Sequence, residues 1–415
     1  MRSLRMHCLV LAVVVATAGC ARHSPLAPTQ SGPAAGPVQV HRTAGVTDAA
    51  SHLEGVIGPG ALYSIDVPDG WNGTLVLYAH GYTGPQLPIA LPGGQFPGVR
   101  DQCLSRGFAI AATSFSENGF AEAEGVRQVH QLEGLFRDQV GMPTRTFLVG
   151  LSLGGLISLD LIETFPGQYA GGLSVSGPVG GTEAEFNYVG DERLLWDLLM
   201  PCHLPGSFTE VPALPLPVSD IVSCITANQQ AFGAVALVHR AEGFPVAGTN
   251  GNQWASSVVQ TLGFHWYGFA DGVERAHGQM PYDNHDAVYT SSVVPAPTLA
   301  WINANIPRYT STPAARNFLR QHYEPSGALK APLLTLHAEQ DPLVPWGHEA
   351  LLLDKVTAAG CLDKLVQFHY PYPTYFGHTD AFTSAQIGLA LDALVAWVDT
   401  GVKPGTPFAL AAGQR

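Results

Sequence analysis

Residues 145–155 read Arg-Thr-Phe-Leu-Val-Gly-Leu-Ser-Leu-Gly-Gly, the most informative stretch of this 415-residue chain. Its apolar start is typical of a buried β-strand, and the run from Leu153 to Phe165 is typical of a helix. Between them, Gly150 and Gly154 flank Ser152, where a β-carbon would collide with the neighbouring strand or helix. The pattern predicts a sharp strand-to-helix turn that holds the serine in a strained backbone conformation.

Short apolar runs alternate with helix-like segments on both sides of this turn. Besides the strand that enters the turn, strands are expected at 61–67, 74–79, 108–115, 172–176, 332–337 and 365–369. Helices are expected around Cys103, at 121–138 and at 381–399. Strands and helices in this order predict an α/β fold, with a mostly parallel sheet covered by helices on both faces.

The alternation stops over residues 182–329. Helix-like pieces, proline-rich joints and an aromatic segment, Phe264-His265-Trp266-Tyr267, replace it. We interpret this stretch as a large cap inserted after the sixth strand, with residues 46–181 and 330–415 as the two parts of the core. The aromatic residues are expected to form the core of the cap or, alternatively, to line an apolar pocket.

The N-terminus has the features of an export signal over residues 1–20. Positively charged residues precede an apolar run that is too short to span a membrane, and Ala18-Gly19-Cys20 follows. This end resembles the lipobox of a bacterial lipoprotein. The resemblance implies lipidation at Cys20, attachment to the bacterial cell envelope, and a flexible tether over residues 21–45. An ordinary cleaved signal peptide is the alternative.

The chain has six cysteines, of which Cys8 leaves with the signal and Cys20 takes the lipid in this interpretation. Four others remain: Cys103, Cys202, Cys224 and Cys361. An even number in an oxidising compartment predicts disulfide bonds. A Cys202–Cys224 bond is favoured because both residues lie in one segment, and Cys103 with Cys361 follows by elimination, although three pairings are possible.

The composition argues against several classes of function. The net charge of −13 would repel the phosphates of a nucleic acid, so no such partner is expected. No Cys/His spacing matches a structural zinc site and no glycine-rich dinucleotide loop is present, so neither metal nor cofactor is expected. One polar cluster in the cap could hold a cation, although a polar loop is the commoner interpretation. It consists of His277, Tyr282, Asp283, Asn284, His285 and Asp286.

A serine hydroxyl becomes a nucleophile only with a base in hydrogen-bond reach, itself oriented by a carboxylate. Downstream of the cap, Asp341 opens an Asp-Pro-Leu-Val-Pro loop just past an expected strand. This position is the carboxyl edge of a parallel sheet, where ligands bind in open α/β folds. His378 lies past the last expected strand, after Gly377, in a loop that can turn its ring toward Ser152.

In this order the three motifs resemble the α/β-hydrolase superfamily of serine hydrolases. The resemblance covers roughly residues 55–180 and 330–400. It implies that Ser152 is the nucleophile, His378 the general base and acid, and Asp341 the orienting carboxylate.

The resemblance extends to the donors that stabilise an oxyanion. His80-Gly81, at the end of the strand 74–79, resembles the His-Gly oxyanion loop of the family. The amides of Tyr82 and Leu153 are therefore expected to bind the oxyanion, the latter assisted by the helix dipole. His80 is expected to shape the loop and not to act as a base.

Other residues compete for the acid and base roles. Glu339 is the nearest alternative acid, whereas Asp380 is too close in sequence to His378 to orient its far nitrogen. His369 lies inside an expected strand and is more readily structural. His337 is expected to hydrogen-bond the backbone of the acid loop.

These parts predict a serine hydrolase that cleaves carboxylic ester bonds through an acyl-enzyme intermediate, acting on a small-molecule or polymeric ester. Two alternatives stay open: a prolyl-oligopeptidase-like serine peptidase and a non-catalytic surface binding protein. The sequence does not determine the oligomeric state.

Overall fold

The computed structural model of the chain describes residues 39–41, 51–370 and 376–405. The expected export signal, Cys8 and Cys20 lie outside the described residues, as does most of the expected tether. Within the described ranges, no helix has both the length and the apolar character needed to cross a membrane.

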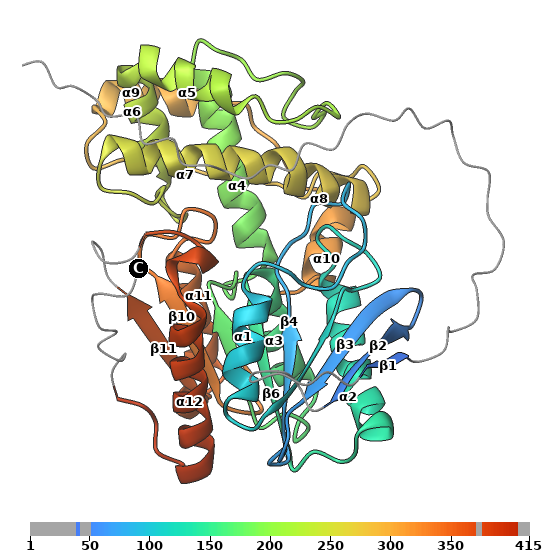
Figure 1. Ribbon diagram of the computed structural model, residues 1–415. Coiled ribbons are helices and arrows are strands. Elements are labelled where there is room, and N and C mark those ends of the chain that lie inside the picture. The colour runs from blue at the N-terminus through green and yellow to red at the C-terminus, as the bar shows by residue number, and fades with distance from the viewer. Residues whose placement is uncertain (1–38, 42–50, 371–375, 406–415) are drawn as a thin grey trace, which may run out of the picture. The chain divides into compact units, whose positions relative to one another are not determined.

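Nine strands of the described chain form one sheet, in the order β1-β2-β3-β5-β4-β6-β7-β10-β11 (Figure 1). Their bounds are β1 Gln39–His41, β2 Ser51–Ile57, β3 Ala61–Val67, β4 Thr74–Ala79, β5 Ala109–Thr113, β6 Arg145–Leu151, β7 Gly171–Val175, β10 Leu333–Ala338 and β11 Leu365–Tyr370. All pairs from β5 to β11 are parallel, and β3 runs antiparallel to β2 and β5. The predicted mostly parallel sheet is confirmed.

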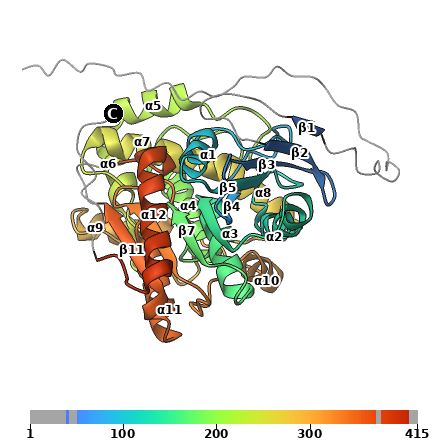
Figure 2. The same ribbon diagram turned by 60° about the horizontal axis from the view of Figure 1, so that its bottom comes forward.

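Helices cover both faces of the sheet, as Figure 2 shows. On one face, α2 (Glu122–Gln139), α3 (Leu153–Thr164) and α11 (Gly347–Ala358) contribute to one apolar cluster. On the other face, α1 (Phe96–Leu104) and α12 (Ser384–Thr400) contribute to a second. Strands β4, β5, β6, β7 and β10 are buried almost throughout, because helices lie above and below them. This strand order and layering is the α/β-hydrolase fold.

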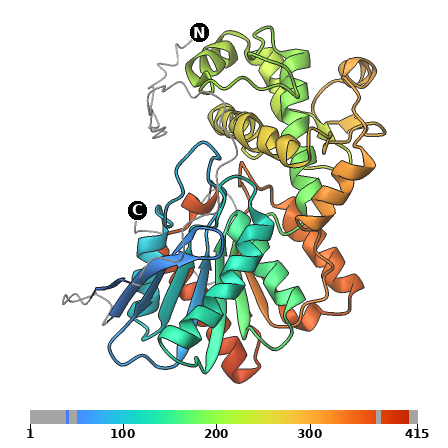
Figure 3. The same cartoon turned by 90° about the vertical axis from the view of Figure 1, so that its right-hand side faces the viewer.

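Between β7 and β10 the chain leaves the sheet and forms a mainly helical segment, gathered beyond one end of the sheet (Figure 3). Its elements are α4 Thr182–Leu199, α5 Val218–Ala227, α6 Gln229–Leu237, β8 His239–Arg240, α7 Gly251–Phe264, a π-helical turn η1 His265–Phe269, α8 Ala270–Arg275, β9 Tyr289–Thr290, α9 Ala296–Asn305 and α10 Pro313–Gln321. Two short 3₁₀ turns, η2 Leu362–Lys364 and η3 Thr379–Ala381, flank β11. The segment follows the sixth strand of the sheet when the three-residue β1 is not counted.

The two outermost strands at one side of the sheet, β1 and β2, are missing from the set that the sequence predicts. In β2 only Leu53 is buried, and the strand mixes polar and small residues with apolar ones. A strand that buries so little carries no continuous apolar run, so the hydrophobic pattern alone does not reveal it.

One disulfide prediction is confirmed and the other is wrong. Cys202, just after α4, is bonded to Cys224 in α5. Cys103 and Cys361 are free thiols. Cys103 is buried in the cluster of α1 and α12, whereas Cys361 packs against the cluster on the opposite face. The sheet lies between them, which places the two residues beyond the reach of a disulfide.

The turn from β6 into α3 has the predicted geometry. Ser152 alone separates the strand from the helix, and its backbone adopts φ 56° and ψ −124°. A β-carbon on Gly150 would lie 1.8 Å from the carbonyl oxygen of Gly154, and one on Gly154 would lie 2.0 Å from that of Ala79. No side chain fits at either glycine, because the obstructing atoms belong to the backbone.

Gly150→Ala is therefore expected to lower the free energy of unfolding by about 3 kcal/mol or more, since the backbone must move to admit the methyl group. The matched control is Gly134→Ala in α2, where an added β-carbon meets no atom within 4 Å. There the change is expected to raise stability by about 0.5–1 kcal/mol, because alanine is the better helix former. Urea unfolding of both variants measures the difference, and equal stabilities would contradict the packing argument.

Candidate active site

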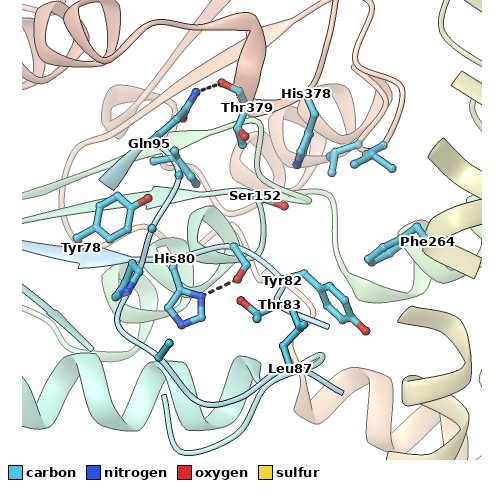
Figure 4. A pocket seen from close by; sticks show the side chains of 18 of the residues that line it. Tyr78, His80, Tyr82, Thr83, Leu87, Gln95, Ser152, Phe264, His378 and Thr379 are labelled. Carbon is cyan, nitrogen blue, oxygen red and sulfur yellow. Dashed lines mark hydrogen bonds between the residues drawn. The ribbon is translucent and has the colours of Figure 1, made fainter. Parts of the chain in front are cut away.

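Ser152 lines a cavity of about 590 Å³ at the carboxyl edge of the sheet (Figure 4). The core contributes Ser152, His378 and the loop that follows β4, and the helical segment contributes Phe264 and Glu185. Most of the remaining wall is apolar and comes from Leu87, Pro88, Leu91, Pro92, Leu343 and Val344. The cavity thus combines an apolar surface with a few polar groups, as small-molecule sites commonly do.

The loop after β4 lies against the serine. A β-carbon on Gly81 would lie 3.0 Å from Cβ of Ser152 and 3.1 Å from the carbonyl oxygen of Leu151, so only glycine fits without a shift. His80 donates its Nδ1–H to the carbonyl of Gly81 at 2.7 Å and stacks on Phe115 with ring centroids 3.9 Å apart. Burial lowers the pKa of His80, so the ring is neutral and shapes the loop.

The structure brings Asp341 and His378 together. His378 Nδ1 lies 2.8 Å from Oδ2 and 3.0 Å from Oδ1 of Asp341, so this nitrogen carries the hydrogen and donates it. The two loops are also tied by the amide of Gly377, which donates to the carbonyl of Gln340 at 3.1 Å. Gly377 has φ 137°, a conformation that favours glycine, and the chain can therefore turn the histidine ring inward.

Asp341 is fully buried yet ionised. Its Oδ1 also accepts the amides of Leu343 and Val344, each at 2.9 Å. Burial alone would favour the neutral acid, but the charge of His378 and the hydrogen bonds from His337 and His378 outweigh it. The pKa of this carboxyl is therefore held below its usual range.

The free end of the His378 ring points toward Ser152 in Figure 4. Both side chains line the same cavity, although no hydrogen bond joins them among the described residues. In a site without substrate, the contact between a nucleophile and its base is often longer than in the reacting complex. The arrangement has the order of parts that nucleophilic catalysis requires: hydroxyl, imidazole and buried carboxylate.

The two residues expected to supply oxyanion donors both border the serine. Leu153 begins α3, and the amides of the first helical turn have no partner within the helix. Tyr82 follows Gly81 in the cavity wall. Its side chain leaves the loop: the hydroxyl donates to the carbonyl of Tyr267 at 3.0 Å, and the ring meets Phe264 edge-on at 5.3 Å.

The competing residues lie elsewhere. Glu339 Oε2 lies 3.8 Å from Nε2 of His369, and that ring stacks on Trp346 at 4.1 Å. Asp380 lies in η3 and is exposed. His337 hydrogen-bonds the backbone of the acid loop, as expected.

A second carboxyl, Glu185, is one that sequence reasoning misses. The amide of Gly180 donates to Nδ1 of His348 at 3.2 Å, so His348 is neutral and donates its Nε2–H to Oε2 of Glu185 at 2.9 Å. Burial, with the nearby charge of Asp341 adding to it, raises the pKa of Glu185 well above the ordinary value. In the sequence, Glu185 is indistinguishable from any acid in the first turn of a helix, where the dipole favours it.

The aromatic segment 264–267 is expected either to line a pocket or to form the core of the cap, and each expectation holds for part of it. Phe264 lines the cavity, whereas His265 and Trp266 are buried in the interior of the helical segment. The indole of Trp266 donates to the carbonyl of Leu214 at 2.8 Å.

Tyr282 and Asp283 of the polar cluster in the cap are engaged in hydrogen bonds with other protein groups. The hydroxyl of Tyr282 donates to Asp191 at 2.5 Å, and Asp283 accepts the amides of His285 and Ser311 at 3.0 Å each. Across the described ranges, no group of three or more His, Cys, Asp or Glu side chains is arranged to hold a metal ion.

No protein-family model and no curated protein sequence matches the chain. Solved structures do. An esterase of Pyrococcus furiosus has 11% sequence identity and a TM-score of 0.41, with 82% of this chain and 90% of that chain covered. Feruloyl esterase B from Aspergillus oryzae has 15% identity and a TM-score of 0.43, covering 85% and 81%. Candida antarctica lipase A has 14% identity and a TM-score of 0.44, covering 86% and 79%. These values are too low to decide activity, so function rests on the geometry of the site itself.

The lowered pKa of Asp341 predicts a pH dependence of stability. A carboxyl whose pKa is lower in the folded state stabilises the fold above its unfolded pKa, about 3.9, and loses that contribution as pH falls. Asp341→Asn keeps an oxygen for the amides of Leu343 and Val344 but has no charge. The stability advantage of the natural chain over this variant is expected to shrink from pH 7 to pH 3, as measured by urea unfolding. An advantage that is constant or grows on acidification would contradict the assignment.

Proposed function

We propose that this chain is a serine hydrolase of the carboxylesterase or lipase type, which cleaves carboxylic ester bonds through an acyl-enzyme intermediate. One observation carries the proposal: Ser152, on its strained turn, shares a cavity with a histidine whose far nitrogen is bonded to the buried carboxylate of Asp341. A nucleophilic site typically combines three features: a strained backbone at a cavity, a base, and an acid that orients the base.

In the proposed reaction, Oγ of Ser152 attacks the ester carbonyl while Nε2 of His378 takes its proton. The hydrogen bond to Asp341 keeps the other ring nitrogen protonated and stabilises the imidazolium that forms. His378 then gives the proton to the leaving alcohol. A water molecule, deprotonated by the same nitrogen, attacks the acyl-enzyme and releases the acid.

The negative charge that develops on the carbonyl oxygen would be received by the amides of Tyr82 and Leu153. Gly81 supports this role because its lack of a side chain lets the loop approach Ser152 closely. Backbone donors of this kind, fixed in advance of the reaction, contribute on the order of 3 kcal/mol each to transition-state stabilisation.

The cavity wall favours an ester with an apolar acyl or alcohol part. Leu87, Leu91, Phe264, Leu343 and Val344 supply much of its surface. A volume of about 590 Å³ lies within the range that small-molecule sites span.

The place of action is proposed from the sequence. The N-terminal resemblance to a lipobox favours export and anchoring through Cys20, and the Cys202–Cys224 bond is of the kind that persists in oxidising compartments. Mass spectrometry of the full-length chain, recovered from the membrane fraction of a bacterial host, should find a diacylglyceryl group on that cysteine.

Ser152→Ala is expected to lower the hydrolysis of p-nitrophenyl butyrate by at least about a thousandfold, because the acyl group then has no acceptor on the protein. The natural chain should gain the mass of a fluorophosphonate at Ser152, and the variant should not. Preference for a peptide anilide over the ester would favour a peptidase instead. Neither turnover nor labelling would indicate a non-catalytic binding protein.

Gly81→Ala is expected to lower kcat about a hundredfold while changing KM little, because the new methyl group pushes the oxyanion loop away from Ser152. Gly84→Ala, in the same loop, is the control: its β-carbon meets only the flexible side chain of Gln86, and its kcat should stay within about twofold. Steady-state kinetics on the p-nitrophenyl ester compare the two, and an equal loss in both would reject the special role of Gly81.

A further inference from the structure

A buried ion pair lies directly behind the proposed triad. His337, on β10, has no exposed surface, and Glu349, on α11, is 1% exposed. Nδ1 of His337 lies 3.1 Å from Oε1 of Glu349, and its Nε2 lies 3.5 Å from Oδ2 of Asp341. Neither residue lines the cavity, and so neither touches a substrate.

Both ring nitrogens of His337 lie against oxygen atoms that can accept a hydrogen bond. Nε2 lies 2.8 Å from the carbonyl oxygen of Val344, which can only accept. Oε2 of Glu349 accepts from Thr335 Oγ and Gln367 Nε2, each at 2.6 Å, as expected of an ionised carboxylate. Its Oε1 faces Nδ1 of His337, so both nitrogens of this ring lie against acceptor oxygens, the arrangement that suits an imidazolium.

The electrostatic balance agrees with the geometry. Burial disfavours the charged ring, but the hydrogen bonds and charges of Asp341 and Glu349 outweigh it and raise the pKa of His337. Two further titratable side chains, Glu185 and His348, lie near enough to interact electrostatically with His337 and Asp341. His348 is neutral because its Nδ1 accepts the amide hydrogen of Gly180.

We propose that His337 and Glu349 are a positioning pair: the buried imidazolium keeps Asp341 ionised and fixed toward His378, and Glu349 keeps that imidazolium charged and oriented. The inference rests on the proposed function of Asp341 and His378. Asp341 is thereby held from three sides, by the amides of its own loop, by His337 and by His378.

His337→Gln tests the pair, because the glutamine amide can still donate to Val344 but carries no charge. Removing a positive charge beside Asp341 makes the Asp341–His378 unit bind a proton more readily. The acid limb of kcat/KM is therefore expected to move to higher pH by about one unit, and kcat/KM at pH 6 to fall about tenfold.

Thr335→Val is the matched control within the same network. It removes one hydrogen bond to Glu349 and leaves every charge in place. The variant is expected to unfold at lower urea concentration, with the acid limb where the natural enzyme has it. A purely structural role of His337 would give both variants this same behaviour and would overturn the inference.

The charge of His337 can also be measured without turnover. In ¹⁵N-histidine-labelled natural enzyme at pH 8, a ring with both nitrogens protonated is expected for His337, and that signal should vanish in His337→Gln. If that variant does not fold, Glu349→Gln replaces it, and the imidazolium signal should then titrate at lower pH than in the natural enzyme. A neutral His337 at pH 8, or an unchanged titration in Glu349→Gln, would overturn the pair. An imidazolium in a chain that hydrolyses no ester would instead reject the proposed function and leave the ion pair standing.

Discussion

The site depends on how closely three backbone segments approach one another at the β6–α3 turn. Gly150 packs on the carbonyl of Gly154, Gly154 packs on the carbonyl of Ala79 at the end of β4, and Gly81 packs on Ser152. These contacts are between main-chain atoms, or between main chain and Cβ, so no rotamer change can relax them. The position of the serine relative to the loop after β4 is therefore a property of the sheet, because β4 and β6 are neighbours in it. Rigid support of this kind is what a preorganised site requires.

Behind the cavity, the surroundings of each buried carboxyl group determine whether it is ionised. Asp341 is an anion with no exposed surface, and such a group persists only when its surroundings replace the water it has lost. Two amides and the rings of His378 and His337 do so here. Glu185 shows the contrasting case. It is buried near the same charges but receives only a neutral imidazole donor, and its pKa rises accordingly. Burial is thus common to both carboxyls, and the partners decide which one carries charge.

Much of the fold can be read from the sequence because its strongest constraints are local. The glycines around Ser152 reflect collisions within a few residues, and the central strands reveal themselves as continuous apolar runs because they are covered on both faces. The order of Ser152, Asp341 and His378 predicts the pair that the structure brings together. Features that depend on residues far apart in the sequence cannot be predicted in this way. Elimination pairs Cys103 with Cys361, because a sequence does not show that a sheet separates them. The π-helical turn after Phe264 changes which side each aromatic ring faces, and an α-helical pattern does not anticipate that shift.

Among the contacts that join the helical segment to the core at the site, the hydrogen bond of Tyr82 has a particular consequence. The hydroxyl of Tyr82, in the loop that supports the serine, bonds the carbonyl of Tyr267 in the π-helical turn, and the hydroxyl of Tyr267 accepts the amide of Leu216. A displacement of that turn therefore moves the acceptor of the Tyr82 hydroxyl, and Tyr82 belongs to the loop that lies against Ser152. Replacing residues 182–329 by a foreign segment would therefore remove the partner that holds the Tyr82 side chain beside the cavity. In the proposed enzyme, the segment that faces the substrate and the loop beside the nucleophile thus share a hydrogen bond, and a change in the first is transmitted to the second.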